Sequence, residues 1–287
     1  MIRNVKKYAS LVVFAHTVFA LPFALISFTL AYQTFPLERP LLLLIKVLGC
    51  MVTARNSAMS FNRLIDRHID AHNERTKNRE LPSGKLSPRA VTIFFIINAT
   101  LFVACAGTIN TLCLCLAFPT LVLLCGYSYT KRFTWLSHFV LGLSLAIAPA
   151  ATWIAVTGTL SLSVLCLSLL VVLWVSGFDI LYALPDHDHD RAHNLFSIPQ
   201  RFGISASLWI SGALHLLVVP VMVAFGLFAR LGGLYLAASL IFTTLLIYQH
   251  AIVRPHRLTK LNHAFFTANG LASILFALLT IWELLGL

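Results

Sequence analysis

The chain has 287 residues, of which 59% are apolar and only 11% are charged, and its mean hydropathy is +0.85. This composition excludes an ordinary soluble globular domain and predicts an integral membrane protein. The formal net charge is +11, but the chain lacks the exposed, soluble basic face that a nucleic-acid partner requires, so we expect no binding to nucleic acid.

Transmembrane helices account for almost the whole chain. A helix that crosses a bilayer needs about 20 mostly apolar residues. Nine stretches meet this requirement: residues 10–32, 41–65, 89–109, 111–130, 133–157, 161–183, 204–228, 231–252 and 263–286. Short polar loops separate them, and no linker or low-complexity tract marks a second domain. The prediction is an all-α fold: a single membrane domain over residues 1–287, built as a bundle of nine transmembrane helices.

The first stretch follows three basic residues, as the core of a signal peptide does. It is about twice as long as a typical signal core and has no clear small-residue cleavage site, so we interpret it as a retained span. The cysteines all fall inside predicted spans and form no CxxC pair, which favours small apolar packing residues over disulfides or zinc ligands. They are Cys50, Cys105, Cys113, Cys115, Cys125 and Cys166.

The basic residues predict the orientation. With the N-terminus in the cytoplasm, sixteen of the 21 lysines and arginines lie in the cytoplasmic tail and loops, against two in the opposite loops. This asymmetry satisfies the positive-inside rule. We therefore predict a multi-pass protein of the cell membrane, which is the inner membrane in a bacterium with two membranes.

The acidic residues gather in two clusters that the same topology places on the cytoplasmic side. A carboxylate near a membrane is costly unless it has a partner or a function. Because one cluster follows the second span and the other lies at the end of the sixth, we interpret them as two halves of one active site that faces the cytoplasm. Their members are Asp66, Asp70, Glu74 and Glu80, and Asp179, Asp186, Asp188 and Asp190.

Spacing supports a shared face in the first cluster. Asn62, Asp66 and Asp70 recur every fourth residue, so they line one face of a helix. Asp179, Tyr182, Asp186 and Asp190 also share a face if their helix continues past Pro185. Proline bends or ends a helix, so this continuation is open.

Carboxylate and amide oxygens suit Mg²⁺, which uses one or two protein carboxylates together with substrate phosphates. Two acidic clusters therefore predict two Mg²⁺ ions, and the neighbouring cations predict a diphosphate. Solvated loop charges are the alternative, but they do not explain why acids avoid nearly all other loops. The histidines of HDHDRAH lack a second His/Cys cluster that could complete a zinc site. The cations are Arg63, Arg67, Arg75, Lys77, Arg79, Lys131 and Arg132.

Several motifs resemble those of one known family. NRLIDRHIDAHNERTKNRELPSGKLS resembles the first aspartate-rich motif of the UbiA superfamily of intramembrane aromatic prenyltransferases, and DILYALPDHDHD with SIPQRFG resembles the second. YSYTKR resembles the Tyr/Lys motif between them, and HTVFALPFAL the usual first span. The resemblance covers nearly the whole chain in order.

The resemblance implies a helical bundle in which two Mg²⁺ bind a polyprenyl diphosphate. An aromatic acid then attacks the allylic carbocation left by ionisation. Metals and cations would take up charge on the diphosphate, and apolar walls would exclude water. By position, the resemblance assigns the first metal ion to Asn62, Asp66 and Asp70, and the second to Asp186 and Asp190. The resemblance assigns the diphosphate to Tyr127, Lys131, Arg75 and Arg79, with Arg132 beside them, and it matches Asp179 and Tyr182 to DxxYA.

Two departures bear on the aromatic acceptor. Members that make the ubiquinone precursor usually read Asn-Asp where this chain reads Asn62-Arg63, and Pro185 is unexpected. The NRxxDRxxD form is closer to the branch proposed to prenylate a naphthoate in the futalosine route to menaquinone. Members of that branch are often labelled 4-hydroxybenzoate polyprenyltransferase, so 4-hydroxybenzoate and a dihydroxynaphthoate both remain candidates.

Other functions stay open. Within the superfamily these are prenyl transfer to haem, chlorophyll or archaeal lipids. From another class, a cation-coupled transporter places buried acids at the bilayer midplane, whereas these acids sit at one rim with excess cations. The DGxxAR sequence expected of a CDP-alcohol phosphotransferase is absent. No obligate protein partner is indicated.

Arg55 lies about midway along the second predicted span, where a cation is costly unless it faces a cavity. It precedes Asp66 by eleven residues, close to three turns at about 3.6 residues per turn, so it shares that face at greater depth. We predict that Arg55 binds the acceptor's carboxylate. The alternative is that it pairs with a backbone carbonyl or another helix for packing.

Overall fold

The structure is a computed structural model that describes residues 8, 10–12, 19–253 and 261–286, with backbone only for 261–266. Within these ranges every regular element is a helix, which confirms the all-α prediction. The short elements η2 (Leu184–Asp186) and α8 (His187–Ala192) lie between α7 and α9. The long helices are α2 (Leu21–Thr34), α3 (Pro40–His72), α4 (Pro88–Gly107), α5 (Thr111–Thr130), α6 (Ser137–Thr157), α7 (Leu162–Ala183), α9 (Ile198–Ala229), α10 (Gly233–Ile252) and α11 (Leu261–Leu285).

Eight helices in the described part of the chain are long and apolar enough to cross a membrane. The remaining long helix, α2, has 14 residues. The predicted span 10–32 includes residues 13–18, which lie outside the described residues. The basic N-terminal tail, the start of HTVFALPFAL and residues 254–260 also lie outside them. The count of nine spans and the orientation therefore remain predictions.

Two helices run further than their apolar stretches. The second predicted span stops at residue 65, but α3 continues to His72, and α9 begins at Ile198 although its apolar stretch starts at residue 204. Hydropathy detects only the part of a helix that is apolar, so polar turns at its ends escape. Ser197 caps α9 by accepting a hydrogen bond from the Gln200 N–H, and a proline occupies its first turn, both common helix starts.

The backbone breaks at two places near the second acidic cluster. The α-helix α7 ends at Ala183, and Pro185 lies in the 3₁₀ turn η2, so Asp186 and Asp190 do not continue the α-helical face of Asp179. Within α9, Gly203 adopts φ 79° and ψ 170°. A positive φ of this kind favours glycine, and it separates the first turn of α9 from the long span that follows.

The chain divides into two compact units, which we describe separately. The first comprises residues 1–17 and 41–129. Its helices are joined by polar as well as apolar contacts. Asn56 on α3 donates to the Asn98 side-chain oxygen on α4 at 2.9 Å, and the Lys46 ammonium donates to the Thr108 carbonyl that follows α4. All six cysteines of the chain are free thiols.

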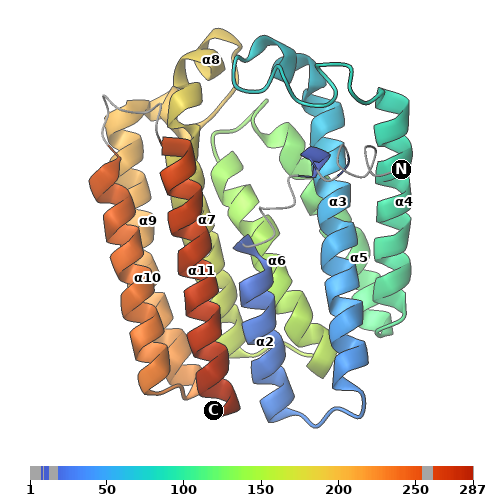
Figure 1. The fold of residues 1–287 in the computed structure, drawn as a ribbon, viewed down its shortest axis with the longest axis vertical. Coiled ribbons are helices and arrows are strands. Elements are labelled where there is room, and N and C mark those ends of the chain that lie inside the picture. Colours follow the sequence, from blue (N-terminus) through green and yellow to red (C-terminus); the bar gives the residue numbers. More distant parts are fainter. Residues whose placement is uncertain (1–7, 9, 13–18, 254–260, 287) are drawn as a thin grey trace. The chain divides into compact units, whose positions relative to one another are not determined.

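The second unit comprises residues 18–40 and 130–287. Its centre is α7, which packs against α6 and α9, while α2 packs against α6 and α11 and α10 packs against α11 (Figure 1). Trp174 of α7 is fully buried and contacts Phe23, Phe178 and Phe242. Gly142 allows the close approach of α6 to α7, because a Cβ there would lie 2.6 Å from the Val172 carbonyl oxygen.

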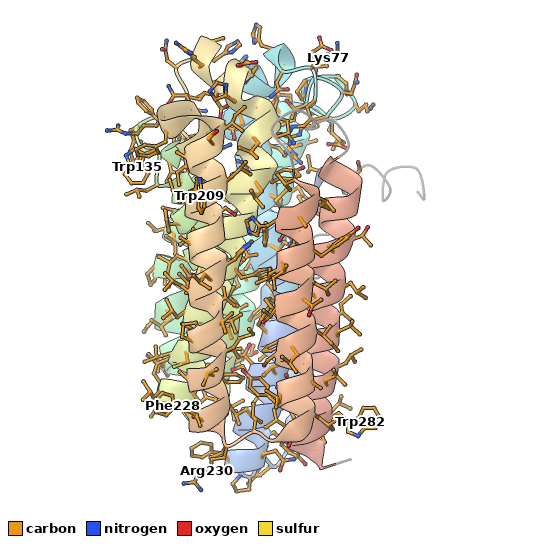
Figure 2. The ribbon with its side chains drawn as sticks, turned by 90° about the vertical axis from the view of Figure 1, so that its left-hand side faces the viewer. Lys77, Trp135, Trp209, Phe228, Arg230 and Trp282 are labelled. Carbon is orange, nitrogen blue, oxygen red and sulfur yellow. The ribbon has the colours of Figure 1, made fainter. Side chains whose placement is uncertain are left out.

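Large apolar side chains cover much of the surface. Trp209, for example, is 81% exposed, as expected of a side chain that faces lipid rather than water. Trp135 and Trp209 lie toward one end of the second unit, and Phe228, Arg230 and Trp282 lie toward the other (Figure 2). Aromatic and charged side chains at both ends of a bundle are typical of the two membrane interfaces.

Candidate active site

Asn62, Asp66 and Asp70 lie on the last three turns of α3, and Glu74 and Glu80 of the first acidic cluster follow in the loop. The Asn62 side-chain amide donates to Asp66 Oδ2 at 2.9 Å, which is the contact expected of side chains four residues apart on one helix face. Both side chains are half-buried. The structure thus brings Asn62 and Asp66 together as the sequence predicted.

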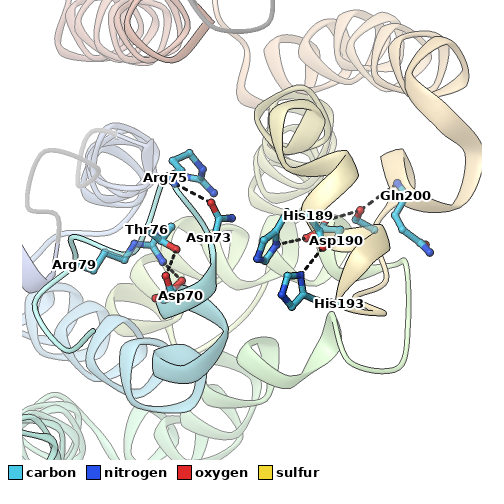
Figure 3. Close-up of polar contacts among 10 residues, drawn as sticks. Asp70, Asn73, Arg75, Thr76, Arg79, His189, Asp190, His193 and Gln200 are labelled. Atoms are coloured by element: carbon cyan, nitrogen blue, oxygen red, sulfur yellow. Dashed lines mark hydrogen bonds and ion pairs between the residues drawn. The ribbon is translucent and has the colours of Figure 1, made fainter. Parts of the chain in front are cut away.

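Asp70 is the most enclosed member of this cluster, at 6% exposure. Arg79 Nη1 donates to Asp70 Oδ1 at 2.7 Å, and Thr76 Oγ1 donates to the Asp70 carbonyl at 2.9 Å (Figure 3). Oδ2 is buried and has no hydrogen-bond partner among the described residues. Burying a carboxylate oxygen without a partner is costly, so this atom is suited to bind a cation.

Arg63 is buried beside these acids, at 5% exposure. Its charge interacts with those of Asp70, Glu80 and Asp66, and also with that of Arg79. Several carboxylates around a buried guanidinium offset part of its desolvation cost. Arg63 is therefore integral to the cluster, although it lies off the face formed by Asn62 and Asp66.

The other charged residues of the loop after α3 differ in their exposure to solvent. Arg75 is exposed, and its backbone N–H donates to Asn73 Oδ1 at 2.9 Å (Figure 3). Glu74 is 89% exposed and pairs with Lys77. Glu80 is buried and accepts a hydrogen bond from Ser10. Glu74 and Glu80 thus have surface or structural contacts of their own.

In the second acidic cluster, Asp186 lies on η2 and Asp190 lies on α8. Their exposed fractions are 6% and 3%, whereas the neighbouring Asp188 side chain is 99% exposed. Ser197 Oγ donates to Asp190 Oδ2 at 2.9 Å, and the His189 ring lies beside Asp190 (Figure 3). Of the three aspartates in this loop, the two that the sequence assigned to metal binding are the buried ones.

A short segment before α9 organises this second cluster. The Leu195 N–H donates to the Asp190 carbonyl at 2.9 Å, and the Phe196 N–H donates to the Lys131 carbonyl at 2.7 Å. Ser197 then holds the Asp190 carboxylate. Within the second unit, the segment thereby joins Lys131 of the YSYTKR motif to the second aspartate-rich motif.

Asp179 lies on α7, in the last turns of the helix that precedes the buried aspartates, and its side chain is 15% exposed. His138 Nδ1 lies 2.7 Å from Asp179 Oδ2. Tyr182, one turn further along α7, is half-buried and packs against the main core. In the YSYTKR motif, Tyr127 and Lys131 are half-buried and Arg132 is exposed.

Arg55 lies within α3, as predicted. Its Nη2 donates to the Val12 carbonyl at a long 3.4 Å. The contact with a backbone carbonyl is the one expected from the packing alternative. The role in acceptor binding stays a prediction.

The donor set of both clusters is carboxylate with amide, which suits Mg²⁺. In the described part of the chain, no three His, Cys, Asp or Glu side chains come close enough to hold a metal by themselves. Mg²⁺ does not require this, because waters and substrate phosphates complete its shell. The orphaned Oδ2 of Asp70 and the buried Asp190 fit such an ion.

Sequence reasoning placed Arg63 among the cations beside the acids but did not predict its burial. It missed His138 as the partner of Asp179 and Ser197 as the partner of Asp190. A signal was available for Ser197, which stands in SIPQRFG as a typical N-cap before a proline. His138 gave no signal, because it lies 41 residues from Asp179.

These observations define a class of protein: a polytopic helical membrane protein with buried carboxylates and cations at the ends of its helices. The model of the UbiA prenyltransferase family matches residues 20–271. The chain belongs to this family and is a membrane prenyltransferase.

Curated relatives match most of the chain. A 4-hydroxybenzoate octaprenyltransferase of Vibrio parahaemolyticus is 33% identical over 236 residues, which cover 82% of each chain. The enzyme of the same name from Vibrio cholerae is 33% identical over 245 residues, which cover 84% of each chain.

Solved structures share the fold. A UbiA homologue from Aeropyrum pernix superposes with a TM-score of 0.82 at 29% identity, covering 92% of this chain and 96% of that one. A UbiA homologue from Archaeoglobus fulgidus bound to GPP and Mg²⁺ has a TM-score of 0.75 at 17% identity, covering 98% and 100%. At that identity the likeness shows the fold alone.

Proposed function

We propose that this prenyltransferase moves a polyprenyl group from a polyprenyl diphosphate to a hydroxylated aromatic acid in respiratory quinone biosynthesis. The observation that carries the proposal concerns Asp70, a buried carboxylate with one oxygen held by Arg79 and the other without a hydrogen-bond partner among the residues that the structure describes. Relatives named 4-hydroxybenzoate octaprenyltransferase support the acceptor class, and the homologue bound to GPP and Mg²⁺ supports the donor class.

Two Mg²⁺ ions are proposed as cofactors. Asn62, Asp66 and Asp70 would hold one, and Asp186 with Asp190 the other. When bound, such ions neutralise charge on the departing diphosphate. The burial of Asp70, Asp186 and Asp190 supports this role, because a buried carboxylate needs a cation or hydrogen bonds to offset its lost hydration.

The protein's own cations would bind the diphosphate oxygens. Arg75, Arg79 and Arg132 offer paired N–H donors, which match phosphate geometry, and Lys131 offers a point charge. Tyr127 would add a hydroxyl donor. The C–O bond of the allylic diphosphate breaks, a ring carbon of the acceptor forms the new C–C bond, and the ring proton leaves. Apolar walls would keep water from the carbocation.

The acceptor has two candidates. The identity to 4-hydroxybenzoate octaprenyltransferases favours 4-hydroxybenzoate. Arg63 favours a dihydroxynaphthoate as the second candidate, since the NRxxDRxxD form resembles the branch proposed to use it, and the structure buries this arginine among the acids. We also propose that the acidic clusters face the cytoplasm, on the evidence of the basic loops.

The decisive experiment offers both acceptors to the purified protein at once. The protein, Mg²⁺ and octaprenyl diphosphate are incubated with equal amounts of 4-hydroxybenzoate and 1,4-dihydroxy-6-naphthoate, and the products are identified by mass. We expect one acceptor to gain the mass of the prenyl group in a Mg²⁺-dependent reaction. If neither acceptor is prenylated with octaprenyl or shorter diphosphates, the proposed acceptor class is wrong.

A further inference from the structure

His138 is fully buried, at 0% exposure, near the start of α6. Both of its ring nitrogens are engaged. Nδ1 lies 2.7 Å from Asp179 Oδ2 on α7, and Nε2 accepts a hydrogen bond from the Ile198 N–H at the start of α9, at 3.4 Å. A single side chain thus connects three helices of the second unit.

These contacts determine where the ring proton is. Because Nε2 accepts from a backbone N–H, the proton of the neutral ring lies on Nδ1 and is donated to the Asp179 carboxylate. The backbone of His138 is also tied to α7, since Ser176 Oγ donates to the His138 backbone carbonyl at 3.2 Å. Asp179 Oδ2 is therefore occupied by a fixed donor, while part of the same side chain remains accessible.

The same contacts join Asp179 to Asp190. Ile198, whose N–H binds His138, directly follows Ser197, whose hydroxyl binds the Asp190 carboxylate at 2.9 Å. Two carboxylates on different helical elements are thus oriented by consecutive residues of one backbone segment. Among the described residues, the imidazole of His138 is the side chain that connects Asp179 to this segment.

We propose that His138 is a positioning residue for prenyl transfer: it orients the Asp179 carboxylate and ties it to the segment that orients Asp190. The inference rests on the proposed function. A purely structural role for His138 would affect turnover whether or not Asp179 is present. In the role proposed here, the effect of His138 on turnover depends on Asp179.

A double-mutant cycle tests this route. The variants are His138→Leu, Asp179→Ala and the double variant, assayed for kcat and for the KM of diphosphate and acceptor. We expect His138→Leu to lower kcat about tenfold or more, since misplacing a reacting or binding group by about 1 Å has effects of that order. In the Asp179→Ala background, His138→Leu should lower kcat little further, because the effects of substitutions at contacting residues are not additive.

His138→Gln is the matched rescue variant. A glutamine amide can donate to Asp179 and accept from the Ile198 N–H, so we expect it to retain kcat within about threefold of the wild type. Thermal unfolding in detergent identifies any variant that fails to fold. If His138→Leu does not fold, His138→Gln and His138→Met, which keeps the bulk without the donor, replace it in the cycle.

Hydrogen exchange at Ile198 provides a measurement that is independent of turnover. Its N–H belongs to the first turn of α9, where no intrahelical acceptor exists, so loss of His138 Nε2 should speed its exchange in the Leu variant and much less in the Gln variant. Unchanged exchange in the Leu variant contradicts the proposed tie to α9.

The outcomes separate the two proposals. If the wild type prenylates neither acceptor, the proposed function fails and the positioning role fails with it. If the wild type is active but the single-variant effects multiply in the double variant, or His138→Leu keeps wild-type kcat, only the role of His138 is overturned. Non-additive losses with rescue by glutamine support it.

Discussion

Buried charge distinguishes a few residues from the many charged side chains at the helix ends. Arg63, Asp70, Asp186 and Asp190 are each more than nine-tenths buried, whereas Glu74 and Asp188, close by in sequence, are almost fully exposed. The two groups cannot be told apart by their positions in the sequence, but they differ in how far their side chains are exposed to solvent. Removing a buried charged partner is strongly destabilising or inactivating, while changing an exposed one has small effects.

This contrast makes a prediction with internal controls. Asp66→Asn, Asp70→Asn, Asp186→Asn and Asp190→Asn should each lower prenyl transfer about a hundredfold or more, because each removes a negative ligand where charge develops in the transition state. Glu74→Gln and Asp188→Asn should leave it within about twofold, as expected for exposed charges. Initial rates at saturating Mg²⁺, with protein amounts matched, provide the measurement. Wild-type rates in both Asp186→Asn and Asp190→Asn would contradict the requirement for two clusters.

Arg55 requires a different measurement, because the structure gives it a backbone contact. If it binds the acceptor's carboxylate, Arg55→Leu should raise the acceptor's KM about tenfold or more, since a charge-assisted hydrogen bond contributes about 1.5–3 kcal/mol. Arg55→Lys should have a smaller effect, and the KM for the diphosphate should hardly change. Weaker diphosphate binding, or unaltered acceptor kinetics, would assign Arg55 to the diphosphate site or to packing against Val12.

At the level of elements, the first turn of α9 combines a helix start with a functional contact. Ser197 accepts from the Gln200 N–H as an N-cap and donates its own proton to Asp190. Ser161 caps α7 in the same way, accepting from the Val164 N–H at 3.3 Å, but has no acidic partner in the described chain. The two serines form a natural matched pair.

We expect Ser161→Ala and Ser197→Ala to lower stability similarly, by about 1 kcal/mol for the lost cap. Only Ser197→Ala should also impair activity and raise the Mg²⁺ concentration for half-maximal rate, because only it releases a carboxylate. Thermal unfolding in detergent and Mg²⁺ titrations of the rate measure both effects. Equal loss of activity in the two variants would mean that Ser197 acts only as a cap.

Prediction from sequence was strongest where local pattern determines structure. Apolar stretches located the long helices within a few residues, except where polar turns extend α3 and α9 and at α2, which begins at Leu21 although its apolar stretch starts at residue 10. The four-residue spacing of Asn62 and Asp66 correctly predicted that they share a helix face. The contact of His138 with Asp179 and the burial of Arg63 depend on tertiary packing between segments far apart in sequence, which periodicity does not encode. Pro185 was correctly recognised as a point of uncertainty, and the α-helix does end before it.

At the scale of the whole molecule, the uneven distribution of lysine and arginine among the loops predicts how the protein is oriented in the membrane. Lys77 stands in the basic loop after α3, and Arg230 follows α9 in one of the loops with few basic residues. Both are exposed. The positive-inside rule places the first in the cytoplasm and the second on the opposite side.

Cysteine labelling tests this topology. In sealed right-side-out vesicles, Arg230→Cys should react with a membrane-impermeant maleimide, and Lys77→Cys should react only after the vesicles are permeabilised. The parent protein, whose six cysteines lie within helices, provides the background. The reverse pattern would invert the orientation and move the proposed active site to the other face.

The break at Gly203 has a consequence for how the enzyme meets its lipid environment. Spanning helices change tilt when the thickness of the bilayer changes. Because the backbone leaves the helical conformation at Gly203, the span from residue 204 to 229 can follow such a change while the turn before it keeps its hydrogen bonds to His138 and Asp190. Lipids with acyl chains of different length should therefore change the tilt of this span without moving the carboxylates of Asp179 and Asp190.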